Sequence, residues 1–488
     1  MKRILTLVLT ASIAASMLAG CQSKGTEGKG TSAEKPVLRQ VGFQRNFDPN
    51  NDPVAKMLEE KTGYKVKYEA LPIENPNDKL NLLMANKEEI DIVKLSGSQY
   101  SKLANEGALE PLDDLLKKHG QTLLKVNSQE SLETAKVNGK IYGIPEKAAR
   151  PFTSSAIAVR QDILDELGMK VPTTTDEFYT LLKTIKDKKN IIPLTGFESV
   201  IHEISGAFGV VTPWEVKDGK ITHRLEEPGM KEYITFMNKL YNEGLIDKEW
   251  PVNNSAKVQE KFTSGKAAMM TYGWGVAPAV TTALNKNFPS SKITMFAGLK
   301  GKDGKQGTWV QATGVGWYIA IPKASKHKED AMKYMDLKVQ PELFKNLAIG
   351  EENVTYKKEA DGKLFPILPK FNEERGNADW FITSTDQKAY EDLWLLRVRK
   401  DKVLYEAFEE IQKQMPYAVE DPLTKAPPLA TVAKYSQKIT KLENDYILKA
   451  IAGAEKLENY NKFVEQWKNE GGAESKKEAN DWYATKKK

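Results

Sequence analysis

Cysteine is almost absent from this sequence of 488 residues, in which Cys21 is the single example. A lone cysteine cannot form an intramolecular disulfide, and it cannot supply the thiolate ligands of a structural zinc site. Histidine is scarce as well, with four residues in the chain. His202-Glu203 begins a zinc-protease pattern, but Gly206 stands where the second histidine ligand would be. We therefore expect no metal site and no cofactor.

The sequence also lacks the common motifs of nucleotide-binding and hydrolytic enzymes. It contains no GxGxxG, no GxxxxGK[ST] and no GxSxG, and the glycine pair at Gly314 and Gly316 lacks the third glycine. Adjacent acids such as Asp113-Asp114 do not define the pair of carboxylates that a glycosidase places across its cleft, although folding could bring such a pair together. These absences favour a protein that is not an enzyme.

No excess of charge of one sign is present. Seventy-two lysines and arginines are mixed with 66 acidic residues, which leaves a formal net charge of +6. Such mixing argues against a nucleic-acid partner. The chain is 40% hydrophobic and contains nine tryptophans, so it can build a large core. The length suits two domain-sized units or one large bilobal body.

Long apolar runs are absent after the first twenty residues. The chain starts with the positive segment Met1-Lys2-Arg3, and an apolar stretch rich in alanine and serine follows over residues 4–19. A charged start, a short apolar core and small residues before the cleavage point are typical of a secretory signal peptide. We assign residues 1–20 to this signal.

Cys21 directly follows the signal, and Leu18-Ala19-Gly20-Cys21 resembles the lipobox of bacterial lipoproteins. That resemblance implies a diacylglycerol (palmitate-type) anchor on the cysteine sulfur, and two acyl chains suffice for stable anchoring. Residues 21–36 hold no large apolar side chain and read as a flexible tether. The alternative is an ordinary cleaved signal with a thiol nearby.

The first third of the mature chain alternates strand and helix patterns. We expect strands at 37–43, 65–69 and 90–95, and a helix that begins at Asp52-Pro53 and ends before Gly63. This alternation indicates an α/β fold with an open, largely parallel sheet covered by helices. Ligands of such sheets bind beyond the carboxyl ends of the strands, where Ser96 follows the third strand.

Later elements continue the pattern and then become mostly helical after His327. We expect a hairpin over 137–145 on the Asn138-Gly139 turn, strands at 154–160, 266–272 and 314–322, and capped helices that open near Thr174 and Pro228.

One acidic loop invites a calcium interpretation. Asp48, Asn50, Asp52 and Glu59 match four positions of a twelve-residue calcium loop, but its sixth position is Pro53 where glycine is needed for the sharp turn. A polar loop that caps a helix is the better interpretation.

Several segments together resemble the family 1 extracellular solute-binding proteins. The segments are Gly143–Phe178, Phe262–Trp274 and Gly314–Asp336, and Asn377–Asp392 with the helical tail resembles the large lipoproteins that feed carbohydrate importers in Gram-positive bacteria. Each motif alone is weak, but their order and spacing are specific. Maltose-binding protein is a distant relative of this architecture.

The resemblance implies a two-lobed, periplasmic-binding-protein-like fold with a hinge, an inter-lobe ligand cleft and a helix-rich C-terminal third. We expect lobe 1 to comprise residues 37–150 and 300–345, and lobe 2 to comprise residues 151–299 and 346–488. The implied protein is a monomeric binding subunit of an ABC importer, anchored on the extracellular face of the cell membrane. It captures an oligosaccharide and delivers it to the permease subunits. The alternatives are an anchored surface carbohydrate-active enzyme and a ligand-sensing lipoprotein.

Sugars offer flat C–H faces that stack on aromatic rings and hydroxyl rims that bond polar side chains. Trp274 is our first candidate, because it matches the aromatic residue of the family's cleft. The other candidates lie in loop-like contexts, at predicted strand ends or at crossings: Trp214, Trp309, Trp380, Arg45, Asp52, Ser96, Arg150 and Glu198. We expect structural roles for Trp317, Trp394 and Trp467.

Overall fold

Two separate β-sheets organise the fold in a computed structural model that describes residues 34–486 except 297, 312–313 and 386. The first sheet has the strand order β2-β1-β3-β15-β6. Its strands are β1 (Leu38–Gly42), β2 (Val66–Ala70), β3 (Ile92–Leu95), β6 (Gly143–Lys147) and β15 (Val315–Ala320). Strand β1 is parallel to β2 and β3, and β15 is antiparallel to β3 and β6.

The second sheet has the order β13-β8-β12-β9. Its strands are β8 (Ser155–Arg160), β9 (Ile192–Thr195), β12 (Ala267–Gly273) and β13 (Ile293–Phe296). Strand β9 is parallel to β12, whereas β8 is antiparallel to both β12 and β13. We call the first sheet with the helices packed on it lobe 1, and the second sheet with its helices lobe 2.

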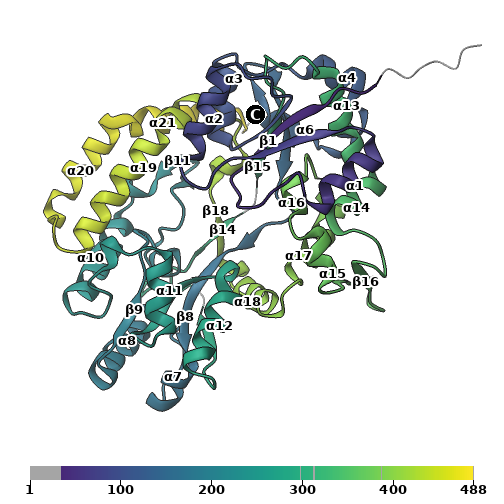
Figure 1. Ribbon diagram of the computed structural model, residues 1–488. Helices are drawn as coiled ribbons and strands as arrows, with labels where there is room; N and C mark the ends of the chain where they lie inside the picture. Colours follow the sequence, from purple (N-terminus) through teal and green to yellow (C-terminus); the bar gives the residue numbers. More distant parts are fainter. Residues whose placement is uncertain (1–33, 297, 312–313, 386, 487–488) are drawn as a thin grey trace, which may run out of the picture. The chain divides into compact units, whose positions relative to one another are not determined.

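A third, small sheet contains the segments that cross between the lobes. Its strands are β7 (Phe152–Thr153), β14 (Thr308–Gln311) and β18 (Ala418–Glu420), in the order β18-β14-β7. Strand β7 lies between β6 and β8 in the chain, and β14 directly precedes β15, so both connect the two large sheets. Figure 1 shows β14 and β18 between the two lobes. We call this the hinge sheet.

The side-chain amide of Gln412 extends the hinge sheet beyond its edge. The backbone nitrogen of Thr153 donates to Gln412 Oε1 at 3.0 Å, and Gln412 Nε2 donates to the Thr153 carbonyl at 2.9 Å. These two bonds imitate the pairing of a neighbouring strand, and β14 pairs with β7 on its other side. The backbone of this crossing segment is therefore satisfied on both edges.

Helices cover both large sheets. Those of lobe 1 are α1 (Pro53–Thr62), α2 (Pro76–Ala85), α3 (Gly97–Asn105), α4 (Asp113–His119), α5 (Gln121–Val126), α6 (Gln129–Thr134), α13 (Lys328–Lys338), α14 (Pro341–Ile349), α15 (Lys370–Arg375), α16 (Ala378–Phe381) and α17 (Gln387–Val398). Those of lobe 2 are α7 (Gln161–Leu167), α8 (Thr175–Lys189), α9 (His202–Ser205), α10 (Pro228–Asn242), α11 (Ser255–Thr263), α12 (Ala277–Asn287), α18 (Lys402–Gln412), α19 (Ala430–Ile451), α20 (Tyr460–Trp467) and α21 (Ala473–Thr485). Short hairpins are β4 (Lys136–Val137) with β5 (Lys140–Ile141), β10 (Trp214–Lys217) with β11 (Lys220–His223), and β16 (Tyr356–Lys358) with β17 (Leu364–Pro366).

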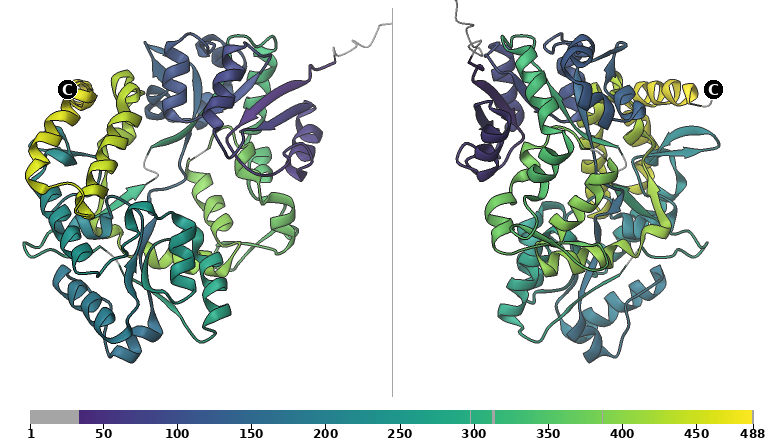
Figure 2. Two further views of the ribbon diagram at one scale, coloured as in Figure 1. Left: turned by 60° about the vertical axis from the view of Figure 1, so that its left-hand side comes forward. Right: turned by 90° about the vertical axis from the view of Figure 1, so that its right-hand side faces the viewer.

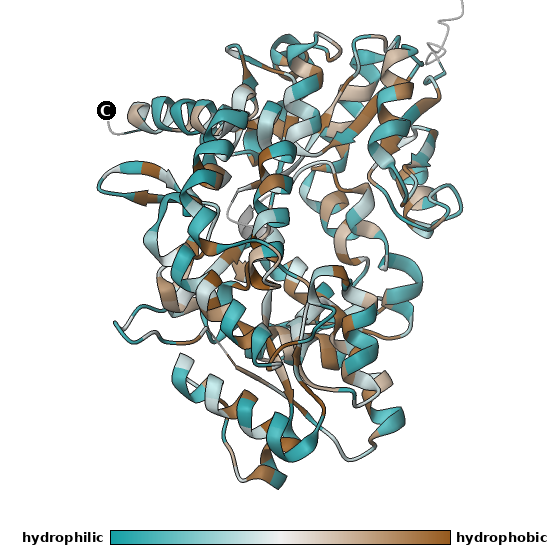
Figure 3. Cartoon of the chain, turned by 90° about the vertical axis from the view of Figure 1, so that its left-hand side faces the viewer, coloured by the Kyte–Doolittle hydropathy of each residue, from teal (hydrophilic) through white to brown (hydrophobic). Residues whose placement is uncertain are grey.

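The predicted local signals explain several of these elements. Asp52 caps α1 by accepting a bond from the backbone nitrogen of Val54, and Pro53 is the first helical residue. Asn138 and Gly139 both have positive φ, as a two-residue hairpin turn requires. The predicted α/β fold with two lobes and a helix-rich end is confirmed, and Figure 3 shows apolar segments along the strands and polar segments on outer helix faces.

The C-terminal helices divide between the lobes. Residues of α14 to α17, among them Leu347 and Leu396, share a hydrophobic core with Val54 and Leu58 of α1. Helices α19 to α21 instead pack into the core of the second sheet. Figure 2 shows α19–α21, in yellow, on one side and the light-green helices α15–α17 on the other. From the sequence we expect all of residues 346–488 in lobe 2. The shared core instead joins α14–α17 to α1 and therefore to lobe 1.

His223 lies in the core of lobe 2. Its ring stacks on Trp467 at 4.2 Å and meets the edge of Trp214 at 4.7 Å, and its Nδ1 accepts a bond from the backbone nitrogen of Leu225. Burial lowers the pKa of this imidazole to about 4, although Glu443 opposes the shift. The ring is therefore neutral in the folded protein at neutral pH.

We predict that this histidine makes lobe 2 sensitive to acid. His223 takes up a proton near pH 6.5 in the unfolded chain but only near pH 4 in the folded protein. Its contribution to the free energy of unfolding is therefore fully present above pH 6.5 and is lost as the pH falls towards 4, by about 3 kcal/mol in total. His223→Asn keeps an acceptor oxygen and should give a lower but flatter stability profile. Urea unfolding from pH 7 to 4 measures this. His327→Gln, at a more exposed site, is the control, and an equal slope in wild type and H223N would contradict the prediction.

Candidate functional site

The directions of the strands bring one edge of each large sheet to the hinge. In lobe 1, Phe43 follows β1, Ser96 follows β3, and β6 ends where β15 begins. In lobe 2, Ser155 begins β8 opposite Gly273 of β12. Residues 148–154 connect the two edges directly. Ligands of open α/β sheets bind at such edges, so the space between them is the candidate site.

Two stacked aromatic rings form part of the lobe 1 edge. Phe43 and Trp317 lie with their centroids 4.9 Å apart at an interplanar angle of 20°, and both are half-buried. Lys94 Nζ lies 5.2 Å and 5.9 Å from the two centroids and pairs with Glu146 at 2.6 Å. The buried ammonium thus supports the rings by cation–π attraction while its charge is neutralised.

An ion-pair network fixes the loop that follows β1. Arg45 donates two bonds to Asp379, at 3.0 Å and 2.7 Å, and Arg397 Nη2 lies 3.0 Å from the same carboxylate. Burial alone would raise the pKa of Asp379, but the two guanidinium groups lower it to about 2. This carboxylate is therefore ionised throughout the physiological range, and it holds Arg45 in a defined position.

The lobe 2 edge carries a polar cluster of serine, histidine and glutamate. Ser155 Oγ donates to Glu203 Oε1 at 2.6 Å and lies 3.0 Å from His202 Nε2, while the Trp309 ring meets the edge of the imidazole at 6.2 Å. The hydroxyl bonds the carboxylate directly, whereas a nucleophilic triad would have the histidine between the two. The cluster is arranged to form hydrogen bonds rather than to activate a nucleophile.

Four aromatic rings meet where the crossing segments enter lobe 2. Trp274, at the end of β12, makes edge contacts with Phe152 at 5.9 Å, Trp394 at 6.2 Å and Phe408 at 5.4 Å. Phe152 also stacks on Trp394 at 5.6 Å. Because Trp394 belongs to α17 and Phe408 to α18, this cluster contains residues of both lobes.

Several buried polar atoms of the crossing segments have no hydrogen-bond partner among the described residues. They are Arg150 Nε, Thr308 Oγ1, Trp309 Nε1 and Gln414 Oε1. A buried polar group left unpaired costs about 1–3 kcal/mol, so native proteins retain few of them without a reason. These four atoms place unpaired polar groups on the segments next to the candidate site.

A separate hollow of lobe 2 lies between α8, α10 and α20. Its lining includes Tyr179, Phe208, Lys231, Glu232 and Tyr460. None of the unpartnered buried atoms of the described residues belongs to this groove. We therefore prefer the inter-lobe edges as the candidate site over the outer groove between α8, α10 and α20.

Some of the candidate binding residues predicted from the sequence lie near the inter-lobe edges, and others are buried in the lobes. Trp274 and Glu198 lie at the lobe 2 edge, Arg45 and Ser96 at the lobe 1 edge, Trp309 on the hinge sheet, and Arg150 on a crossing segment. Trp214 and Trp380 are buried in hydrophobic cores, and Trp380 donates its indole proton to the Phe43 carbonyl at 3.0 Å. Asp52 is buried as a helix cap, where it also accepts a bond from Asn377.

The candidate residues that sequence reasoning missed are Phe43, Trp317, Trp394 and His202. Phe43 stands at the end of a predicted strand, a position that could have identified it. Trp317 and Trp394 were assigned structural roles because only the tertiary fold brings their strand and helix to the inter-lobe edges. His202 was considered only as a zinc ligand.

The described residues include no group of three His, Cys, Asp or Glu side chains placed to hold a metal ion. In the acidic loop, Asp48 accepts bonds from the backbone of Asn50 and the side chain of Asn51. Among the helices that the structure describes, none is both long and apolar enough to cross a membrane. Cys21 and residues 1–20 lie outside the described residues.

Two lobes joined by a hinge sheet, with facing sheet edges rich in aromatic and polar groups, define a solute-binding protein. The family described as bacterial extracellular solute-binding protein matches residues 42–342, and the chain belongs to this family. It is similar to two proteins of Bacillus subtilis (strain 168). Lipoprotein LipO is 27% identical and the polygalacturonan/rhamnogalacturonan-binding protein YtcQ is 26% identical, over 97% and 96% of each chain.

A solved structure has the same fold. The Streptococcus pneumoniae ABC-transporter substrate-binding protein FusA, in complex with kestose, gives a TM-score of 0.72 at 17% identity and covers 93% of this chain and 99% of its own. The predicted membership in the solute-binding family is thus confirmed. The family and these relatives are binding proteins rather than enzymes.

We predict that the Trp274 ring contributes to ligand binding. Truncation of a central aromatic residue at a binding site commonly costs 2 kcal/mol or more, so Trp274→Ala should weaken oligosaccharide binding by about tenfold or more. Titration calorimetry measures the affinity, and circular dichroism checks the fold. Since Trp274 packs with three other rings, the melting temperature of the variant should also fall by a few degrees.

The matched control for this variant is Trp482→Ala. Trp482 is half-buried on α21, next to Tyr483, and lies on neither inter-lobe edge. Trp467, for which the sequence also predicts a structural role, is fully buried, so its truncation would destabilise the core and it is not a suitable control. Unchanged affinity in W274A, or an equal loss in W482A, would contradict the assignment of Trp274 to the site.

Proposed function

We propose that this chain is the lipid-anchored binding subunit of an ABC importer, and that it captures an oligosaccharide between its lobes for delivery to the permease. The observation that carries the proposal is the pair of facing edges with half-buried aromatic rings and unpartnered polar atoms. Rings such as Trp274 and Trp317 offer flat apolar surface, as sugar C–H faces require. The names of YtcQ and of FusA with kestose support a carbohydrate ligand.

The hinge sheet supplies a mechanism for capture. Its strands are short, and two of them continue directly into the large sheets at Ser155 and Val315. Small backbone rotations in such crossing segments move whole lobes as rigid bodies. Closure would bring the Phe43–Trp317 pair and the Trp274 cluster onto opposite sides of one ligand, and the ligand would stabilise the closed form by contacting both.

We predict that a bound oligosaccharide closes the lobes. Small-angle scattering should give a smaller radius of gyration at saturating ligand than without it, and the melting temperature should rise because the ligand binds only the folded protein. A thermal-shift screen of plant and bacterial oligosaccharides selects the ligand. A clear thermal shift with an unchanged radius would support binding but contradict closure.

The anchor is proposed from the sequence, and the lipoprotein name of LipO supports it. Lipidation of Cys21 would keep the binding protein beside its permease. We predict that Cys21→Ala releases folded protein into the medium, which fractionation and immunoblotting measure. Ser23→Ala, two residues later, is the control and should stay in the membrane fraction. Retention of C21A in that fraction would contradict the anchor.

A further inference from the structure

The loop after β9 holds Glu198 in a fixed position at the lobe 2 edge. Trp250 Nε1 donates to the Glu198 carbonyl at 2.9 Å, and Asn253 Nδ2 donates to the Gly196 carbonyl at 3.0 Å. Gly196 packs so closely on Trp250 that a Cβ there would lie 2.3 Å from the ring. The backbone that carries the carboxyl group is therefore fixed from behind.

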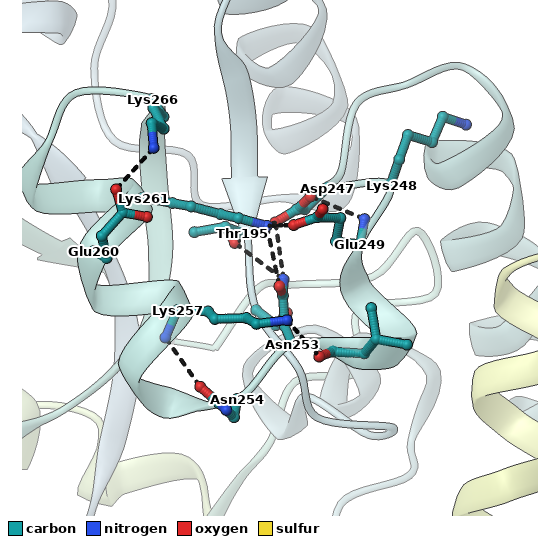
Figure 4. Close-up of polar contacts among 12 residues, drawn as sticks. Thr195, Asp247, Lys248, Glu249, Asn253, Asn254, Lys257, Glu260, Lys261 and Lys266 are labelled. Atoms are coloured by element: carbon teal, nitrogen blue, oxygen red, sulfur yellow. Dashed lines mark hydrogen bonds and ion pairs between the residues drawn. The ribbon is translucent and has the colours of Figure 1, made fainter.

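A buried ion-pair network stabilises this support (Figure 4). Asp247 accepts bonds from Thr195 Oγ1 at 2.7 Å, Asn253 Nδ2 at 2.8 Å and Lys261 Nζ at 2.7 Å. Burial opposes ionisation of Asp247, but Lys261 and the two neutral donors lower its pKa. Because the network orients Asn253, which bonds Gly196, it determines where the Glu198 loop lies.

The carboxyl group of Glu198 has no cationic partner among the described residues. The backbone nitrogen of Phe197 donates to it at 3.2 Å and the Thr271 hydroxyl of β12 lies close to it, but no lysine or arginine of the described residues forms an ion pair with it. Burial raises the pKa of Glu198, and the nearby Glu203 raises it further. Glu203 is also buried; the Ser155 hydroxyl donates to it at 2.6 Å, and His202 Nε2 lies 3.3 Å from it.

The cations of the lobe 1 edge and the crossing contact carboxylates, but Asp379 is shared between Arg45 and Arg397 and does not neutralise both. Arg45 is bidentate on Asp379, Lys94 pairs with Glu146, and Arg150 Nη1 lies 3.4 Å from Glu391. Lys147, at the end of β6, and the half-buried Lys400, whose pKa is lowered by burial and by Arg397, have no ion pair within the described part of the chain. Unpaired cations therefore lie near the lobe 1 edge, whereas Glu198 and Glu203 make the lobe 2 edge acidic.

We propose that the lobe 2 side of the cleft selects a neutral sugar unit, and that Glu198 accepts a hydrogen bond from a sugar hydroxyl while disfavouring a sugar carboxylate. A sugar hydroxyl can donate to the Glu198 carboxylate, which accepts hydrogen bonds when ionised. A uronate brings a second negative charge beside Glu198 and Glu203, and like charges in a poorly solvated site repel strongly. The inference rests on the proposed carbohydrate-binding function.

The test compares neutral and acidic sugars of the same stereochemistry. Short oligosaccharides of galactose, glucose and mannose are titrated in parallel with the matching galacturonate, glucuronate and mannuronate oligosaccharides at pH 7 and constant ionic strength. The account predicts a neutral ligand that binds about tenfold or more tightly than its uronate counterpart. If uronates bind equally well or better, for instance through Lys147, the inference is overturned and the carbohydrate-binding function stands.

The variant Glu198→Gln assigns the selectivity to one side chain. The amide keeps the shape but removes the charge, so the preference for the neutral sugar should shrink at least about fivefold. The melting temperature should stay constant or rise, because no cation loses a partner. Glu260→Gln, an exposed residue paired with Lys266, is the matched control and should leave the preference unchanged. An unchanged preference in E198Q overturns the role of Glu198, and if neither sugar series binds, the proposed function fails together with the inference.

Discussion

The pairing of the crossing segments in the hinge sheet is the constraint on which the site depends. Strand β14 pairs with β7 and β18, and Gln412 pairs with the free side of β7. These bonds hold together the strands that leave the two large sheets, so the sheet edges face a common space. Without this sheet, Trp317 and Trp274 would belong to separate bodies, and neither edge alone surrounds a ligand.

Buried charged groups are stabilised differently at the two sheet edges. In lobe 1, guanidinium and ammonium groups pair with carboxylates, which fixes Arg45 and supports the Phe43–Trp317 stack from beneath. In lobe 2, the Asp247–Lys261 pair lies behind the loop and leaves Glu198 without a cation. Lobe 1 thus presents a rigid aromatic surface with cations beside it, and lobe 2 presents acceptors that a hydroxyl can satisfy.

Local sequence signals predicted much of lobe 1 but little of the hinge. Asp52-Pro53 and Asn138-Gly139 fix their helix and turn by short-range chemistry, and the β-α alternation follows from apolar spacing. Strand β14 has no such signal, because its pairing with β18 joins residues about a hundred positions apart. For the same reason the sequence could not distinguish Trp214 and Trp380, which pack in cores, from Trp309, which lies on the hinge sheet.

Hydrogen–deuterium exchange with and without the oligosaccharide of largest thermal shift tests the central claim most directly, namely that the ligand binds between the two sheet edges. The account predicts slower exchange in segments of both lobes and of the hinge, around Phe43, Arg150, Glu198 and Trp274, with little change around α10. Protection confined to one lobe, or centred on the outer groove between α8, α10 and α20, would contradict it.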